Sequence, residues 1–181
     1  GQIDTLTDRE IAALVRFLSE LGRTPEYTIS RRQLARTWDV MQATREAEFR
    51  LRRTSFAMAA SHDPAFVWQK QYSTVAGELP MNDIPVVSVR SGSAAGAQGV
   101  GFARCTLKAE TAGRVVLQFN DVSGLALRQN EIPVDLSESV TIDVTPGDHR
   151  LTFTVDNAQR SQPLQAEIAV DGTTAVVTFE N

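Results

Sequence analysis

Two adjacent side chains with oxygen atoms, Asn120 and Asp121, are the candidate ligand-binding residues of this sequence. They follow a run of alternating apolar and polar residues and precede Gly124, so a turn at the end of a β-strand is expected there. Amide and carboxylate oxygens in such a loop can coordinate calcium or accept a hydrogen bond from a sugar hydroxyl. An Asn-Asp pair also forms turns by bonding to its own backbone. The sequence leaves both interpretations open.

The other residue types that could do chemistry show no catalytic or metal-binding spacing. His62 and His149 are far apart, and His149 follows a Pro-Gly-Asp turn, where a histidine is expected to hydrogen-bond locally. The single cysteine, Cys105, excludes a disulfide within the chain, and its apolar surroundings indicate a small buried side chain. Neither a Gly-x-Ser-x-Gly motif nor a phosphate-binding glycine loop is present. We therefore expect no catalytic residue and no metal site in this chain, and we do not expect an enzyme.

The composition is that of a chain that folds around its own core. Its 181 residues suggest one or two domains, and a hydrophobic fraction of 42% allows a sizeable core. The formal net charge of −4 divides into +1 over residues 1–80 and −5 over residues 81–181, which disfavours nucleic acid as a partner. No apolar run is long enough to span a bilayer, so no membrane span is expected.

The first half of the chain is expected to combine helices with a strand. A capping box followed by apolar residues at helical spacing predicts an amphipathic helix over residues 8–21, whose apolar face needs a partner. Residues 35–41 are expected to form a strand because they contain Thr, Trp and Val. Residues 44–60 have a helical composition.

From about residue 84 the sequence is typical of an antiparallel β domain, because short alternating runs are separated by turn residues. Strands are expected at 86–90, 101–109, 114–120, 124–129, 131–135, 138–144, 149–156, 164–170 and 174–179. Asp171-Gly172, between two apolar runs, predicts a hairpin. The expected fold is mainly β with an α-helical N-terminal part. It comprises an antiparallel, jelly-roll-like β-sandwich over residues 84–181, preceded by a mixed linker or packing region with short helices over residues 23–83.

One short stretch resembles a known family. Residues 6–18, Leu-Thr-Asp-Arg-Glu-Ile-Ala-Ala-Leu-Val-Arg-Phe-Leu, resemble the last helix of class I cytochromes c, which packs against the haem. The resemblance implies that residues 1–22 are the remnant of such a helix. The haem attachment motif Cys-x-x-Cys-His is missing from the sequence, so no cofactor is expected in this chain, and a haem c would belong upstream in the parent protein.

A second, longer stretch of sequence resembles a family in which such a cytochrome helix is expected. Residues 18–80, with Leu-Gly-Arg-Thr-Pro-Glu-Tyr-Thr at 21–28 and tryptophans at 38 and 68, look like the tail of planctomycete-type membrane-bound dehydrogenase or haem-binding proteins. In many members of that family, a β-rich C-terminal region follows a cytochrome c domain. The resemblance implies a C-terminal fragment of a redox protein that is periplasmic or extracellular.

The β region itself is similar in layout to protective-antigen-like β-sandwiches, and the similarity covers residues 124–134 and 140–153. In the lectin members of that family, paired aspartates bind calcium, and here their position falls on Asn120-Asp121. The Asp-Gly pair after the second strand is replaced by Asn130-Glu131. The resemblance implies a carbohydrate-binding-like sandwich with its candidate ligand contacts at Asn120 and Asp121.

Together these observations predict a non-catalytic accessory module of an extracytoplasmic, multidomain haem c protein. The module would pack against other domains of the parent chain, or bind a carbohydrate or another ligand. Two alternatives stay open. One is electron transfer or haem binding by the parent, with the haem site outside this chain. The other is a stand-alone, calcium-dependent, lectin-like domain. The expected partners are the other domains of the parent chain and a glycan.

Overall fold

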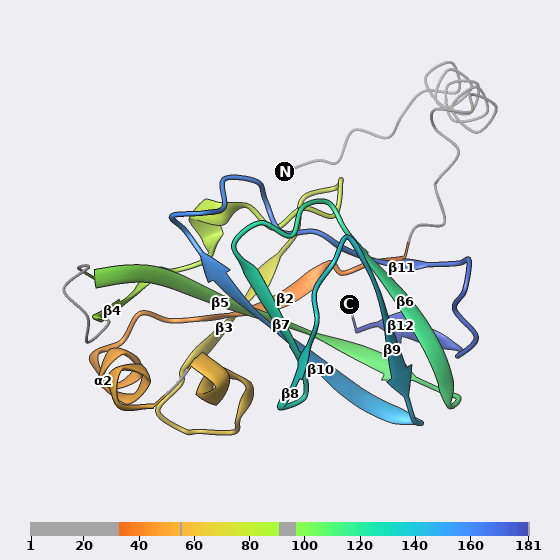
Figure 1. Cartoon of the computed structure of the whole chain (residues 1–181), viewed down its shortest axis with the longest axis horizontal. Coiled ribbons are helices and arrows are strands. Elements are labelled where there is room, and N and C mark those ends of the chain that lie inside the picture. Colours follow the sequence, from red (N-terminus) through yellow and green to blue (C-terminus); the bar gives the residue numbers. More distant parts are fainter. Residues whose placement is uncertain (1–32, 55, 91–96, 181) are drawn as a thin grey trace, which may run out of the picture. The chain divides into compact units, whose positions relative to one another are not determined.

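The computed structural model describes residues 33–54, 56–90 and 97–180, which form two antiparallel β-sheets (Figure 1). The mainly β class expected from the sequence is confirmed. Strand bounds also agree closely with expectation: a strand was predicted over residues 114–120, and β6 spans Gly113–Phe119. The helix predicted over residues 8–21 lies outside the described residues.

The elements follow one another in a simple order. The strands are β1 (Gln33–Leu34), β2 (Thr37–Met41), β3 (Trp68–Tyr72), β4 (Val87–Arg90), β5 (Ala97–Ala109), β6 (Gly113–Phe119), β7 (Leu125–Gln129), β8 (Ile132–Val134), β9 (Ser139–Val144), β10 (Gly147–Asp156), β11 (Ala166–Ala169) and β12 (Val177–Phe179). The helical elements are α2 (Arg45–Arg53) and the short 3-10 helices η2 (Phe56–Ala60) and η3 (Met81–Asp83).

The larger sheet is organised around β5. Its strand order is β3-β2-β5-β10-β7-β8, and β4 and β12 also pair with β5. On one side β5 pairs with β10 without interruption, from Val100 opposite Asp156 to Ala109 opposite Gly147. On its other side β5 pairs in turn with β4, β2 and β12. One long strand therefore joins chain segments from both halves of the sequence.

The smaller sheet has the order β1-β11-β6-β9, and its inner face shares one hydrophobic cluster with the larger sheet. Strands of both sheets alternate between buried and exposed residues, as in β9, where Val140, Ile142 and Val144 are buried and their neighbours are exposed. This period of two places one row of each strand in the core. The sheets therefore enclose the main core between them.

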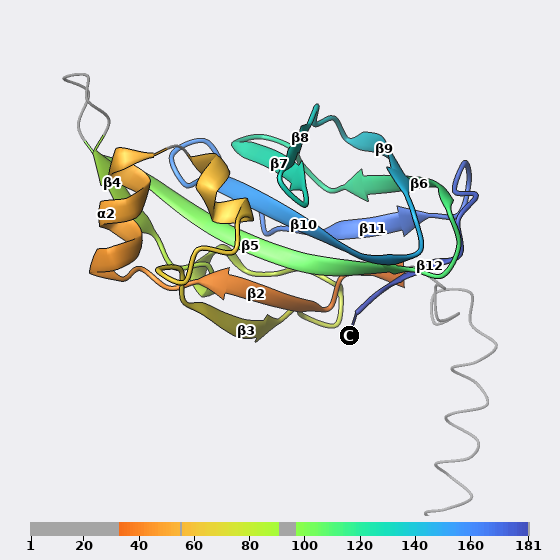
Figure 2. The same cartoon turned by 90° about the horizontal axis from the view of Figure 1, so that it is seen from below.

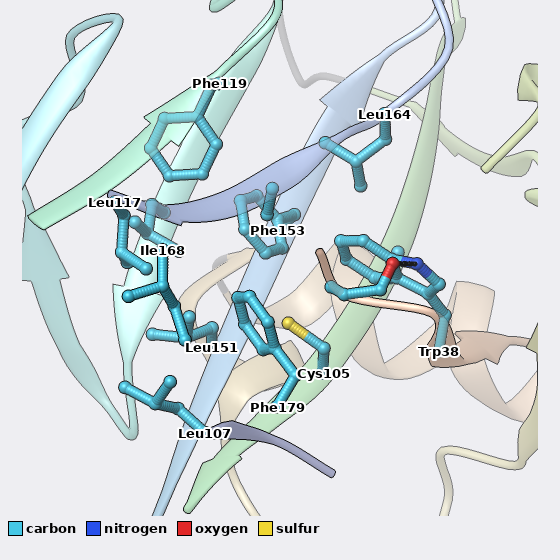
Figure 3. Packing of buried hydrophobic residues seen from close by; sticks show 14 of the residues in the cluster. Trp38, Cys105, Leu107, Leu117, Phe119, Leu151, Phe153, Leu164, Ile168 and Phe179 are labelled. Atoms are coloured by element: carbon cyan, nitrogen blue, oxygen red, sulfur yellow. Dashed lines mark hydrogen bonds between the residues drawn. The ribbon is translucent and has the colours of Figure 1, made fainter. Parts of the chain in front are cut away.

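Aromatic contacts run through the middle of this core (Figure 3). Trp38 and Phe153 are fully buried, and their ring centroids are 5.6 Å apart in an edge-to-face arrangement. Phe119 of the smaller sheet meets Phe153 in the same way at 5.8 Å. The indole N–H of Trp38 donates to the Ala35 carbonyl at 3.2 Å, so its one polar atom is satisfied inside the core.

A second hydrophobic cluster, which we call the outer core, covers part of the opposite face of the larger sheet. Thr44 caps α2 by accepting a hydrogen bond from the Ala47 N–H at 3.1 Å, and α2 then buries Ala47 and Leu51. Phe56 of η2 packs edge to face on Phe102 of β5 at 6.0 Å. Figure 2 shows α2 beside β4 at one end of the sheet. The outer core comprises Met41, Ala47, Leu51, Ala59, Phe66, Val87, Val89, Val100 and Phe102.

The hairpin predicted at Asp171-Gly172 is not formed. β11 pairs with β1 and β6 in the smaller sheet, whereas β12 pairs with β5 in the larger one. The segment between them crosses from one sheet to the other, and the hydroxyls of Thr173 and Thr174 accept hydrogen bonds from the backbone N–H groups of Val116 and Arg114 on the way. Asp171-Gly172 does form a turn, as predicted. The strands on either side of it, β11 and β12, belong to different sheets that pack on the same core.

The boundary expected at residue 84 does not coincide with a boundary of the folded unit. The described residues from Gln33 onward form one compact unit. The region 33–83, expected to be a linker or packing segment, contributes β1, β2 and β3 to the two sheets. Its strand β2 buries Trp38, Val40 and Met41 completely, which ties this region to both cores.

We expect Phe153→Ala to lower the free energy of unfolding by about 3–5 kcal/mol, because it leaves a cavity between two other aromatic rings. Phe49→Ala is the matched control. Phe49 is 56% exposed on α2 and contacts the Arg53 guanidinium at 4.3 Å, so its loss should change stability by less than about 1 kcal/mol. Urea denaturation of both variants measures the difference. Equal losses would contradict the assignment of Phe153 to the centre of the core.

Candidate ligand-binding site

Asn120 and Asp121 follow β6, as expected, and both contact the side chain of Arg160. This side chain is fully buried, and its guanidinium donates to the Asn120 Oδ1 at 3.2 Å and to the Asp121 carbonyl at 2.7 Å. It also donates to the Pro163 carbonyl at 2.7 Å, and the Asn120 amide donates to the same carbonyl at 2.8 Å. Arg160 thus fastens the loop before β11 to the end of β6.

The Asp121 carboxylate is engaged as well. Its Oδ1 accepts a hydrogen bond from the Ser123 N–H at 2.9 Å, and its Oδ2 lies 3.6 Å from the Arg160 guanidinium. The hydrogen bond from Ser123 is the main cause that lowers the pKa of Asp121, and the charge of Arg160 adds to it. Asn120 and Asp121 therefore make the turn, and a calcium ion or sugar at this pair would compete with Arg160 for their oxygens.

A different group of polar residues surrounds a cavity of about 300 Å³ on the outer face of the larger sheet. This volume is at the lower end of the range for small-molecule sites. We call it the face cavity. It is lined by residues that are distant in sequence, namely Ala60, His62, Thr106, Asn130, Glu131, Asp148, Arg150 and Glu180.

The sheet register sets the floor of the face cavity. Arg150 of β10 lies opposite Thr106 of β5, and both follow the outward row of their strands. Glu180, just after β12, is held beside them because its N–H donates to the Thr106 carbonyl at 2.9 Å. Asp148 precedes Arg150 by two residues and therefore points to the same face.

The β7–β8 turn forms one wall. Asn130 has a positive φ of 55°, which an asparagine tolerates better than most residues. Its N–H donates to the Arg150 carbonyl at 2.6 Å, and its Oδ1 accepts from the Arg150 N–H at 3.0 Å. Glu131 follows in the same turn. The turn and β10 are thus locked together by two hydrogen bonds, which places Glu131 at the cavity.

The loop after η2 forms the opposite wall through His62. The Arg150 guanidinium lies 3.2 Å from His62 Nε2. A guanidinium has only donors, so Nε2 is the acceptor in this contact, and the proton of the neutral ring is assigned to Nδ1. Asn130 therefore holds the backbone of Arg150 by two hydrogen bonds, and His62 contacts its guanidinium. This arrangement places a cation at the base of the cavity.

A small hollow of about 30 Å³, the side hollow, adjoins the face cavity and shares Thr106 and Glu180 with it. Its polar lining is completed by Thr37, Asp39, Lys70 and Arg104.

Arg104 is the most firmly held of these residues. It pairs with Asp39 at 3.2 Å and stacks on the Trp68 ring at 4.0 Å. Burial lowers the pKa of Arg104, and the bond to Asp39 opposes this effect.

Charges of both signs line the two spaces, and apart from the Arg104–Asp39 pair they do not neutralise one another. Among the described residues, Glu131, Asp148 and Glu180 have no ion-pair partner within 4.0 Å, and neither does Lys70. Unpaired charges on a surface are ordinary, because water solvates them. Here, however, donors and acceptors converge on one concavity, which makes it a candidate site.

Two further expectations are confirmed. Cys105 is 3% exposed in the main core, and burial raises the pKa of its thiol, so it stays protonated. His149 is also buried, and its Nε2 lies 2.7 Å from the Thr145 carbonyl, four residues earlier in the same turn. Neither residue reaches the face cavity.

Comparison of the chain with protein-family models, curated proteins and solved structures found no match. Over the described ranges, no three His, Cys, Asp or Glu side chains are grouped so that they could hold a metal ion. No helix in this part of the chain is long and apolar enough to cross a membrane. The resemblances to cytochromes c and to planctomycete-type proteins stay predictions.

We expect Arg160→Met to lower the free energy of unfolding by about 3 kcal/mol, because two carbonyl oxygens lose a charged donor. Arg114→Met is the control. Arg114 is an exposed arginine of β6, and its replacement should stay within about 0.5 kcal/mol. Thermal and urea unfolding measure both. A loss below about 1 kcal/mol for Arg160→Met would show that Arg160 does not hold the loops.

Acid should destabilise the fold partly through Asp121. Its pKa is lower in the folded chain, so its contribution is present above the unfolded value, about 4, and is lost as the pH falls through the folded value. We expect the Tm of Asp121→Asn to fall less than that of the wild type between about pH 5 and pH 2. Asp135→Asn, at an exposed aspartate that is not among the hydrogen-bond partners of Arg160, controls for the loss of one charge. Parallel wild-type and Asp121→Asn curves would contradict this assignment.

Proposed function

We propose that this chain is a non-catalytic accessory module, a jelly-roll-like β-sandwich that binds a neutral, polyhydroxylated ligand such as a sugar in the face cavity. The observation that supports the proposal is the mixed lining of that cavity. Carboxylates and a guanidinium face one space, and most of them have no ion-pair partner among the described residues.

The charge pattern favours hydroxyl groups over charged ones. A hydroxyl donates one hydrogen bond and accepts two, so adjacent hydroxyls can satisfy Arg150 on one side and Asp148 or Glu131 on the other. The three carboxylates repel an anionic ligand. They attract a cationic one, but a cation offers no acceptor to the Arg150 guanidinium, whereas a hydroxyl can serve both kinds of group. Hydrogen bonds to charged partners are the stronger kind, which suits a ligand that is strongly hydrated when free.

The geometry also supports a binding role because the cavity is built before a ligand arrives. Arg150 and Asn130 are held by backbone hydrogen bonds in the β7–β8 turn, and His62 supports the guanidinium from the other side. A site fixed in this way loses little conformational freedom on binding. The cavity lies on the face of a sheet, so its floor moves only if the ladder moves.

In this proposal the module belongs to a multidomain, periplasmic or extracellular haem c protein. The support is the sequence resemblance of residues 6–18 and 18–80, and the haem would lie upstream, outside this chain. The module would bring the parent protein to a glycan. The alternative in which the module only packs against other domains is tested by the same experiment, since it predicts no sugar binding. For a calcium-dependent lectin at Asn120 and Asp121, the support is the resemblance of the strand layout alone.

Titration of the full chain with methyl glycosides of glucose, galactose and mannose tests the proposal, with and without calcium. We expect millimolar or tighter binding to at least one of them. Asp148→Ala should weaken it roughly tenfold, because one charged hydrogen bond is lost. Asp143→Ala, an exposed aspartate of β9 outside the cavity, is the matched control.

The possible outcomes separate the alternatives. No binding of any of the three sugars at millimolar concentration would overturn the proposal. Binding that needs calcium and is lost in Asp121→Asn, but not in Asp148→Ala, would move the site to the end of β6. Release of reducing sugar from oligosaccharides by the wild-type chain would overturn its non-catalytic part.

A further inference from the structure

We propose that the side hollow is a specificity pocket that receives one small hydroxyl-bearing branch of the sugar, such as the hydroxymethyl group of a hexose. This inference rests on the proposed function and deepens it. Thr106 and Glu180 line both the side hollow and the face cavity, so the two spaces border each other. In this proposal the sugar ring lies in the face cavity and one of its branches enters the hollow.

The size of the hollow selects a small group. Its volume of about 30 Å³ is enough for one water-sized group and too small for a second sugar ring. The walls do not yield easily, because Arg104 is fixed between Asp39 and the Trp68 ring. Asp39 in turn belongs to β2, whose register with β5 places it opposite Arg104. A bulky substituent such as an acetamido group would have to displace this stack.

The chemistry of the hollow selects a neutral hydroxyl. Lys70 and Arg104 donate hydrogen bonds, Asp39 and Glu180 accept them, and Thr106 does both. A hydroxyl at this point can use partners of both kinds. A carboxylate or an ammonium branch would face two like charges as well as two opposite ones, so it could use only half of this lining.

Lys70 is the residue through which the pocket is best tested. It lies opposite Asp39 in the β2–β3 ladder, is exposed, and lines the side hollow but not the face cavity. Its replacement should therefore change the recognition of the branch more than the recognition of the ring. Lys108 is the matched control, since it is an exposed lysine of the same sheet, on β5, that lines neither space.

The experiment compares sugars that differ only in the hydroxymethyl group: D-glucose with D-xylose, D-galactose with L-arabinose, and D-mannose with D-lyxose, as methyl pyranosides titrated into the full chain by calorimetry. For the pair that contains the preferred hexose, we expect the wild type to bind the hexose about tenfold more tightly than the pentose. Lys70→Met should reduce this ratio to about two or less, whereas Lys108→Met should keep the wild-type ratio. O-acetylation of the hydroxymethyl group, which enlarges the branch, should weaken binding.

The outcomes distinguish this inference from the function on which it rests. If hexose and pentose bind with equal affinity, the specificity pocket is wrong and the sugar site stands. If the wild type prefers the hexose but neither Lys70→Met nor Lys108→Met changes that preference, other residues bind the hydroxymethyl group and the inference is also wrong. If neither sugar binds, the proposed function itself fails. The Tm of each variant, measured beside the wild type, shows whether a lost ratio comes from a lost fold.

Discussion

The pairing of β5 with β10 is the interaction on which the rest of this structure depends. Ten consecutive residue pairs join the two strands, from Val100 with Asp156 to Ala109 with Gly147. Because side chains alternate, one row of this ladder enters the main core and the other faces the opposite side. A slip of one residue would exchange the two rows and would remove both cores and the face cavity together.

The outward row of β5 explains why the cavity lies where it does. From Phe102 through Arg104 and Thr106 to Lys108, it changes from an aromatic residue buried in the outer core to an exposed lysine. The helices α2 and η2 cover only the apolar end, and His62 stands just beyond η2. The face cavity therefore forms where the cover by α2 and η2 ends and the rest of the same sheet face is exposed.

The sequence was informative wherever a local signal decides the structure. Alternation located the strands after residue 84, turn residues located their ends, and the apolar neighbours of Cys105 indicated its burial. It failed where pairing is non-local. Asp171-Gly172 has hairpin chemistry, but nothing in the sequence says that the two flanking strands join different sheets. The same limit hid the role of residues 33–83, in which β1 pairs with β11 and β2 pairs with β5, each more than 60 residues away.

The candidate sites show this limit most clearly. Asn120 and Asp121 are adjacent in sequence and are therefore predicted together as ligand contacts, yet a buried arginine about 40 residues later binds their oxygens. The face cavity brings together His62, Arg150 and Glu180, which no spacing rule connects. At the Asn120–Asp121 turn the polar groups are satisfied within the protein. In the face cavity the charged groups have no ion-pair partners among the described residues. Since burying Arg160 requires compensating bonds whereas charges around an open cavity do not, only the second arrangement leaves its hydrogen-bonding capacity available to a ligand.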